Sequence, residues 1–127
     1  MYLPKDYKNI YPKEKKRHKY NAKSIVIDGH KFPSKKEGKR YLELKLQQHC
    51  GFIKNLELQP RYILQDGFRR KGKWISQIAF TPDFRYHKDC EIFVEDVKGG
   101  NATKTEAYSI RKRLLLKKEL DINFIET

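Results

Sequence analysis

Hydrophobic and polar positions change their spacing several times along the chain, and each change marks a predicted element. Short β-branched or aromatic runs predict strands, whereas apolar residues three and four apart predict helices. Asp28-Gly29 favours a two-residue hairpin turn, and Ser34 with Glu37 has the spacing of a helix capping box. The predicted elements, in chain order, are a hairpin over 25–32, a helix over 35–49, a strand over 52–59 and its continuation at 62–64, an exposed basic turn at 69–73, strands over 74–80, 83–86 and 91–97, a helix over 104–119 and a strand over 122–125.

This order of elements predicts one small mixed α/β domain over residues 24–127. We expect a turn at 87–89 to join the strands at 83–86 and 91–97. Trp74 is interpreted as a core residue rather than a platform on which bases stack. The apolar residues assigned to the helices are Tyr41, Leu42, Leu44 and Leu46 in the first and Ala107, Ile110, Leu114 and Leu115, on one face, in the second.

The composition adds a strong positive charge to this picture. The 127 residues hold 29 Lys and Arg against 16 Asp and Glu, a net charge of +13. Such an excess favours nucleic acid as the partner, because cations that neutralise phosphates release condensed counterions. A merely solubilising charge is the alternative. Residues 1–23 are especially basic and predict an irregular arm that either orders on DNA or remains a frayed tail.

Several classes of protein are excluded by the same sequence. No window approaches the roughly 20 apolar residues of a membrane span, and we expect no secretory leader. Cys50 and Cys90 have no Cys or His at zinc spacing, so neither a disulfide scaffold nor a zinc finger is supported. We therefore expect a cytoplasmic protein without a membrane partner.

One window reverses the sign of the charge. From Asp83 to Asp96 there are five acidic residues against two basic ones. Carboxylates repel phosphate, but Mg²⁺ binds hard oxygen ligands together with a substrate phosphate and so reconciles the two. Side chains alternate along a strand, which places Asp96 and Lys98 on one face, and a hairpin would bring Asp83 opposite Asp96. The backbone carbonyl of Val97 is a further candidate ligand.

These residues resemble the signature of the PD-(D/E)xK nuclease superfamily. Pro82-Asp83 is followed, after twelve intervening residues, by Asp96-Val97-Lys98. Four stretches over roughly residues 24–125 are similar to a phage and prophage family of small nucleases, which is distantly related to archaeal-type Holliday junction resolvases and to the transposon-end endonuclease TnsA. These stretches are Phe32–Tyr41, Leu58–Pro60, Thr81–Phe84 and Val94–Gly99.

The resemblance implies a restriction-endonuclease-like fold, in which helices flank a central mixed β-sheet. It also implies Mg²⁺-dependent DNA hydrolysis, with Mn²⁺ as a substitute. Asp83, Asp96 and Glu37 would be metal ligands and catalytic residues, and Lys98 would position the attacking water and stabilise developing charge. The implied substrate is a Holliday junction or other branched DNA in recombination. The implied protein is a homodimer, encoded by a phage or prophage, that acts on DNA in the host cytoplasm. The residues expected to contact DNA are Lys35, Lys36, Gln59, Arg69, Arg70, Lys104, Tyr108, Arg111 and Lys112.

Each candidate also has a structural alternative. Glu37 could close the capping box, although its alignment with the inward-facing side of its helix favours the metal. Asp83 could be a turn residue, and Asp96 with Lys98 a surface ion pair. Glu95 points to the other face of its strand and is expected to be structural or exposed to solvent. Gln59 could be a residue at a strand end without a role in DNA binding. The residues of the second helix, Tyr108, Arg111 and Lys112, could belong to a solvated helix face. For the whole chain, the alternative is a non-catalytic DNA-binding recombination accessory protein.

Overall fold

The structure, a computed structural model, describes residues 24–98 and 105–127. The predicted basic segment at the N-terminus (1–23), the loop at 99–101 and Lys104 lie outside the described residues. The elements are β1 (Ile25–Ile27), β2 (His30–Phe32), α2 (Lys35–His49), β3 (Lys54–Leu58), β4 (Tyr62–Gln65), β5 (Phe68–Arg70), β6 (Lys73–Ile75), β7 (Ile78–Phe80), β8 (Phe84–Lys88), β9 (Glu91–Asp96), α3 (Glu106–Lys118) and β10 (Ile122–Glu126).

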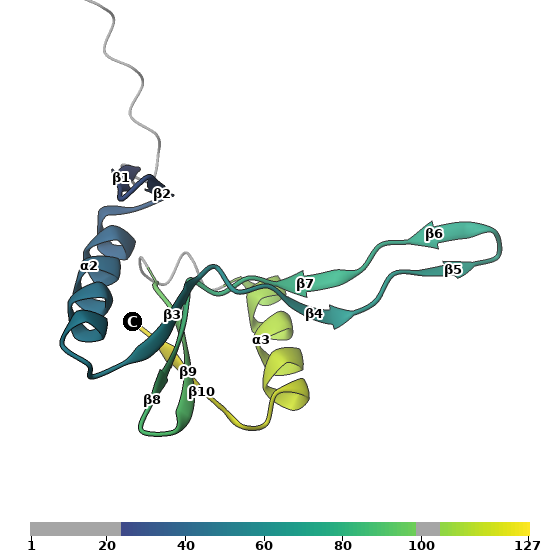
Figure 1. Ribbon diagram of the computed structural model, residues 1–127. Coiled ribbons are helices and arrows are strands. Elements are labelled where there is room, and N and C mark those ends of the chain that lie inside the picture. Colours follow the sequence, from purple (N-terminus) through teal and green to yellow (C-terminus); the bar gives the residue numbers. More distant parts are fainter. Residues whose placement is uncertain (1–23, 99–104) are drawn as a thin grey trace, which may run out of the picture.

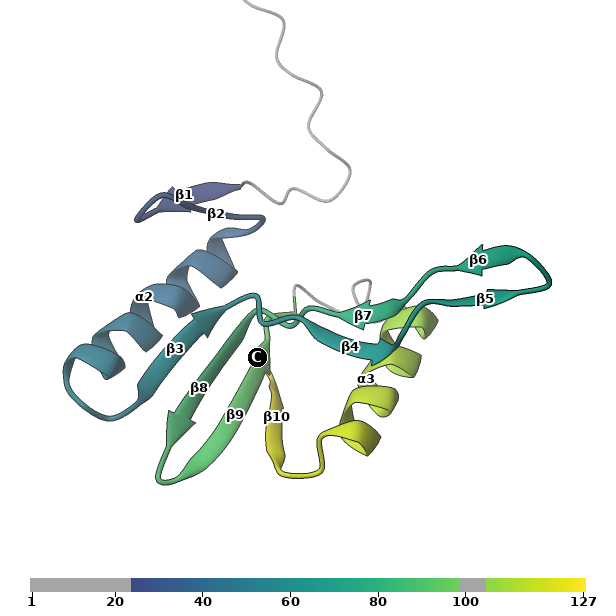
Figure 2. The same cartoon turned by 45° about the vertical axis from the view of Figure 1, so that its right-hand side comes forward.

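A four-stranded mixed sheet with the order β10-β9-β8-β3 forms the centre of the molecule. β8 pairs antiparallel with both β3 and β9, whereas β10 returns through α3 to pair parallel with β9. The two helices lie on opposite sides of this sheet (Figures 1 and 2). The predicted mixed α/β class is therefore confirmed.

Alternation along the central strands divides the core between the two helices. Phe84 of β8 points to the side of α2 and packs with Tyr41 and Leu44 of that helix. Val94, which is paired with the residue after Phe84, points to the other side and packs with Leu115 of α3. All five side chains are buried, so each sheet face has a helix as its cover.

The β1–β2 hairpin covers the beginning of α2. A Cβ atom at Gly38 would lie only 2.8 Å from Cγ2 of Ile25, so the absence of a side chain lets the hairpin pack directly on the helix. The turn residue Asp28 accepts a hydrogen bond of 2.9 Å from the Tyr41 hydroxyl. The hairpin and the helix start, both predicted from local sequence, are thereby joined.

A long two-stranded ribbon projects from the sheet, formed by β4 with β7 and then by β5 with β6 (Figure 1). The prediction of one strand over 74–80 is wrong, because pairing is interrupted between β6 and β7. The predicted basic turn at 69–73 is also too wide. Only Lys71-Gly72 turns, with φ angles of 49° and 75° that suit a type I′ hairpin. Trp74 lies on the outer part of the ribbon and is 60% exposed, so its assignment to the core is wrong.

The helices bury fewer apolar residues than predicted. Leu42 and Leu46 of α2 are exposed, and so are Ala107, Ile110 and Leu114 of α3. The more buried positions of α3 follow a different stripe, namely Tyr108, Lys112 and Leu115. The face of α3 that packs on the sheet therefore includes the ring of Tyr108 and the aliphatic part of Lys112. A count of apolar residues does not include such side chains.

Two strand boundaries also differ from the predictions. β3 begins at Lys54, and Phe52 before it is 70% exposed, whereas Ile53 is buried. β8 continues to Lys88, which moves the turn from 87–89 to Asp89-Cys90. Both turn residues have positive φ angles, of 50° and 64°. Within the described residues, no helix is long and apolar enough to cross a membrane.

Candidate metal and nucleic-acid site

The β8–β9 hairpin brings two of the predicted acidic residues together. Phe84 of β8 pairs with Glu95 of β9 in an antiparallel ladder. Asp83 precedes Phe84 and Asp96 follows Glu95, so the two aspartates meet at the same end of this pair of strands. The Asp83 carboxylate accepts a hydrogen bond of 2.7 Å from the Val97 backbone N–H. The Asp83 N–H donates in turn to the Glu95 carbonyl at 3.1 Å. The strand backbone thus fixes Asp83 beside Asp96.

Glu37 reaches the same place from the first turn of α2. Its backbone N–H donates to the Ser34 hydroxyl at 3.2 Å, which caps the helix as predicted. The residue is only 6% exposed, and its carboxyl group lies within hydrogen-bonding reach of Asp83. The backbone of Glu37 thus takes part in the helix cap, while its side chain lies beside the acids Asp83 and Asp96.

Burial and crowding perturb these carboxyl groups. Loss of solvent is the largest cause that raises the pKa of Asp83, and the nearby Asp96 and Glu37 act in the same direction. The hydrogen bond from the Val97 N–H opposes them, and the net result is a pKa of about 8. Burial also raises the pKa of Glu37, and the charge of Asp96 acts in the same direction. Three carboxyl groups in a poorly solvated site cannot all ionise cheaply without added positive charge. Added positive charge beside these groups would therefore favour their ionised form.

Lys98 supplies one positive charge to the cluster. Its Nζ lies 2.6 Å from Oδ2 of Asp96, as expected for residues on one strand face. The same Nζ lies 3.4 Å from the centre of the Tyr108 ring. The side chain is only 14% exposed, so the ion pair is partly buried rather than a solvated surface contact. Tyr108 on α3 therefore orients Lys98 toward the acids.

The donor chemistry of the cluster fits a hard divalent cation, since every side-chain donor is a carboxylate oxygen. No three His, Cys, Asp or Glu side chains in 24–98 and 105–127 are arranged so that they could hold a metal ion. Mg²⁺ is commonly held by one or two carboxylates with waters and substrate phosphate, so the predicted pair of Asp83 and Asp96 matches the number of carboxylates that it usually takes. The Lys98 N–H donates to the Thr127 carbonyl, and the Thr127 N–H donates to the Asp96 carbonyl. Because peptide groups alternate in direction along a strand, the peptide groups of Val97 point to the opposite side, where its N–H meets Asp83. Metal binding by Asp83, Asp96, Glu37 and the Val97 carbonyl stays a prediction.

A basic groove lies between α2 and the end of β9, on the side of the Val97 side chain. It has a volume of about 380 Å³. Lys36 spans its inner edge and donates a hydrogen bond of 2.6 Å to the Lys98 carbonyl. The residues lining the groove are Lys36, Lys39, Arg40, Glu43, Val97 and Thr127. Positive side chains of α2 therefore line a groove whose edge is linked to the segment that carries Asp96 and Lys98.

Comparison with known proteins places the chain in a family without assigning its chemistry. A family model described as "Protein of unknown function (DUF1064)" matches residues 17–126. The chain belongs to the DUF1064 family. No curated protein and no solved structure matches it.

The residues of this DUF1064 protein predicted to contact DNA do not form one surface. Lys35 is exposed at the start of α2, beside the groove. Gln59 is exposed after β3 and its N–H donates to the Asp83 carbonyl at 2.9 Å, which places it near the acids. Arg69 and Arg70 lie far out on the ribbon in β5.

The helix α3 of the DUF1064 chain presents its predicted contacts in two directions. Tyr108 faces Lys98, and Lys112 pairs with Glu126 of β10. Arg111 is exposed. Of these residues only Arg111 is directed to solvent, whereas Tyr108 contacts Lys98 of the site and Lys112 contacts β10.

Sequence reasoning missed Arg40, which binds Glu95 on the other face of β9. Arg40 Nε and Nη2 each lie 3.0 Å from a different Glu95 carboxylate oxygen, and the Glu95 side chain is fully buried. Glu95 is therefore structural, one of its two predicted roles. Arg40 follows Glu37 by one helical turn, and Glu95 precedes Asp96. The pair thus holds α2 against β9 where the acids meet, and the position of Arg40 one turn after Glu37 was the available signal.

Proposed function

We propose that this DUF1064 protein is a Mg²⁺-dependent DNA endonuclease of the PD-(D/E)xK type. The observation that carries the proposal is the meeting of Glu37, Asp83 and Asp96, from α2 and the two central strands, with Lys98 bound to Asp96. A mixed sheet between two helices is compatible with the restriction-endonuclease-like fold, which is part of the proposal. Such acids in a basic chain suit hydrolysis of phosphodiester bonds, because a cation allows carboxylate and phosphate to approach each other.

The protein groups have separable roles in this reaction. Asp83 and Asp96 would hold the metal with Glu37 beside them, and bound Mg²⁺ would polarise the phosphate and lower the pKa of water. Lys98, held by Asp96 and the Tyr108 ring, would position the attacking water and stabilise negative charge that develops on the phosphate. The groove cations of α2 would hold the DNA backbone beside these groups. The products would carry 5′-phosphate and 3′-hydroxyl ends.

The substrate class is part of the same proposal. A Holliday junction or other branched DNA, cut symmetrically by a homodimer during recombination, is supported by the family resemblance and by the +13 charge. A phage or prophage origin and action in the host cytoplasm are supported by the resemblance alone. Cleavage of a four-way junction ahead of a duplex of the same sequence would support this choice.

The test is a cleavage assay with the full chain on four-way junction, duplex and single-stranded DNA. Asp83→Asn and Lys98→Met are expected to lower the Mg²⁺-dependent rate at least about 10²-fold while DNA binding persists. Asp89→Asn is the matched control, because Asp89 is an exposed acid in the turn of the same hairpin. Chelator should abolish cleavage and leave salt-sensitive binding. Equal behaviour of wild type and Asp83→Asn on all three substrates would favour the non-catalytic DNA-binding protein instead.

A further inference from the structure

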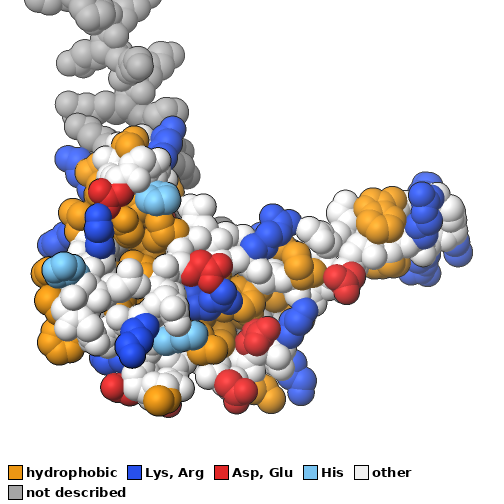
Figure 3. All heavy atoms as spheres, viewed as in Figure 1, with side chains coloured by type: hydrophobic (Ala, Val, Ile, Leu, Met, Phe, Trp, Pro, Cys, Tyr) orange, Lys and Arg blue, Asp and Glu red, His pale blue; other side chains and the backbone are white. Residues whose placement is uncertain are grey.

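The outer part of the ribbon, residues 67–77, forms an exposed basic arm. It is held at its root by Lys118 of α3, which donates a hydrogen bond to the Ile63 carbonyl of β4. Every residue of β5 and β6 is exposed. Figure 3 shows positive side chains gathered at the outer end, with hydrophobic side chains beside them. The arm carries four cations and no acid, namely Arg69, Arg70, Lys71 and Lys73.

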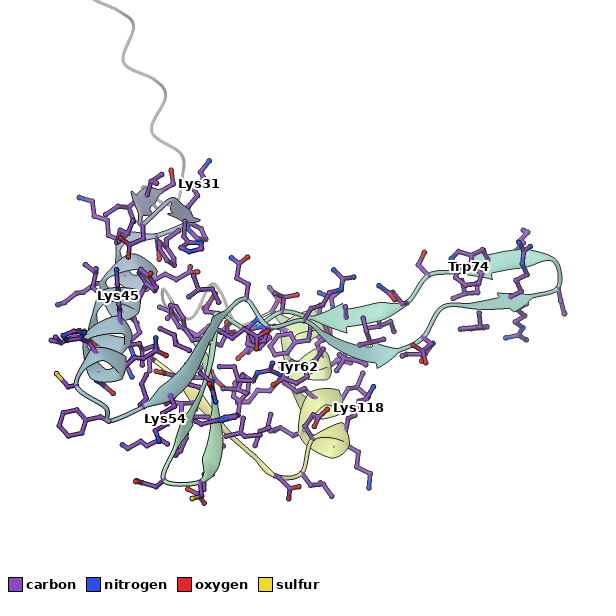
Figure 4. The ribbon with its side chains drawn as sticks, in the orientation of Figure 1. Lys31, Lys45, Lys54, Tyr62, Trp74 and Lys118 are labelled. Atoms are coloured by element: carbon purple, nitrogen blue, oxygen red, sulfur yellow. The ribbon has the colours of Figure 1, made fainter. Side chains whose placement is uncertain are left out.

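Trp74 lies on one face of this arm, where its side chain contacts the opposite strand. It pairs with Arg69, so both side chains project from the same face. A Cβ at Gly67 would lie 2.4 Å from Cζ2 of Trp74, which shows that the six-membered edge of the indole rests directly on the Gly67 backbone. The ring nevertheless remains 60% exposed (Figure 4). The glycine therefore supports an indole whose remaining surface is open to a ligand.

The opposite face of the arm is also apolar and uncovered. Phe68 and Ile75 pair across the strands and are 41% and 40% exposed. An isolated two-stranded ribbon is marginally stable at best in water. Large apolar groups displayed on such a ribbon mark a binding surface more often than a structural one.

The charge of the arm decides which partner fits it. A second copy of the chain carries +13 and is repelled by the cations of the arm, whereas a phosphate backbone is attracted. An indole beside a guanidinium group is a combination on which bases stack. Stacking requires a base whose face is not already covered by its neighbours in a duplex, as at a branch point or in a single strand.

We propose that the arm binds DNA where its bases are unpaired, with Trp74 stacking on a base and the flanking cations contacting the adjacent phosphates. This inference rests on the proposed function, because unpaired bases are a feature of the branched DNA proposed there as the substrate. It concerns a part of the fold separate from the carboxylate cluster, so it is tested without catalysis.

The test uses the fluorescence of Trp74, the only tryptophan of the chain. The full-length protein is titrated in chelator with oligo(dT) and with a duplex of equal phosphate content. The single strand is expected to quench the emission strongly and the duplex weakly. By anisotropy of a labelled oligo(dT), Trp74→Ala should bind at least about fivefold more weakly, and Trp74→Phe should retain part of the affinity.

Two further variants control for folding and for charge. Phe52→Ala removes an equally exposed aromatic side chain elsewhere and should bind as wild type does. Arg69→Gln should lower the salt dependence of binding by about one phosphate contact. Thermal unfolding of Trp74→Ala should match that of wild type, since the ring lies outside the core.

Equal quenching by duplex and single strand, or wild-type affinity of Trp74→Ala, would overturn the proposal. Either result would leave the cleavage assay unaffected, because binding is measured in chelator. Conversely, cleavage that is insensitive to Asp83→Asn, together with Trp74-dependent binding, would reject the nuclease and retain the arm as a DNA-binding element.

Discussion

The ion pair between Arg40 and Glu95 offers a direct test of how the carboxylate cluster is held. Two hydrogen bonds of 3.0 Å join the guanidinium group to both oxygens of a fully buried carboxylate. Arg40→Met keeps most of the side-chain volume but leaves the Glu95 charge buried without this partner. Breaking a buried pair in this way costs about 3–5 kcal/mol.

The structure places the expected loss at the lower end of that range. The Arg40 side chain is 24% exposed, so water can partly replace it. A loss of about 3 kcal/mol in the free energy of unfolding corresponds to a fall of about 10 °C in Tm for a domain of this size. The assay is urea and thermal unfolding of the chelated protein at pH 7, followed by circular dichroism.

A matched pair on the same helix is the control. Lys45 pairs with Asp28, but the two side chains are 52% and 43% exposed, so Lys45→Met should cost less than about 1 kcal/mol. Adding Glu95→Gln to Arg40→Met should recover part of the loss, because the buried charge is removed. The reasoning would be refuted if Arg40→Met were no more destabilising than Lys45→Met, or if Glu95→Gln made the double variant worse.

Three further predictions follow from single groups. Because burial and the neighbouring acids raise the pKa of Asp83 to about 8, its contribution to stability is full below the pKa of about 3.9 of an unfolded Asp and is lost as the pH rises through 8. Between pH 5 and pH 8.5, chelated wild type should therefore lose about 3 kcal/mol more unfolding free energy than Asp83→Asn, and parallel pH profiles would contradict this. Within the described residues, the buried Tyr108 hydroxyl has no well-formed hydrogen bond, so Tyr108→Phe should leave the Tm within about 2 °C, and a much larger fall would show that the hydroxyl is satisfied. Gly67→Ala places a methyl group 2.4 Å from the Trp74 ring and should shift the tryptophan emission while changing the unfolding free energy by less than about 1 kcal/mol, whereas an unchanged spectrum would show that the ring does not rest there.

Local chemistry carried the successful predictions about the fold. The Asp28-Gly29 turn and the Ser34 cap depend on residues close in sequence, and the structure contains both of them. The juxtaposition of Asp83 and Asp96 was predictable for the same reason, since one hairpin and the alternation of side chains suffice to bring them together.

Longer-range contacts account for the errors. The pattern of Trp74–Phe80 is that of a strand, but no pattern tells whether a second layer will cover it. Helix α3 covers Phe80, whereas every residue of β5 and β6 in the outer part of the ribbon is exposed. Of the apolar residues predicted to form one face of α3, only Leu115 is buried, and Tyr108 rather than Ala107, Ile110 or Leu114 packs with it. Which face a helix buries depends on the partner it meets, and that partner is set by the topology.

By itself, the sequence determined the order of elements, the strongly basic character and the acidic window with Lys98 on the face of Asp96, because turn chemistry, charge and alternation act over a few residues. Only the tertiary structure decided that Glu37 joins those acids, that Arg40 neutralises Glu95 across 55 positions and that Trp74 is displayed on an arm. Those outcomes depend on how α2, the sheet and the ribbon pack. Packing couples residues whose separation along the chain carries no local signal.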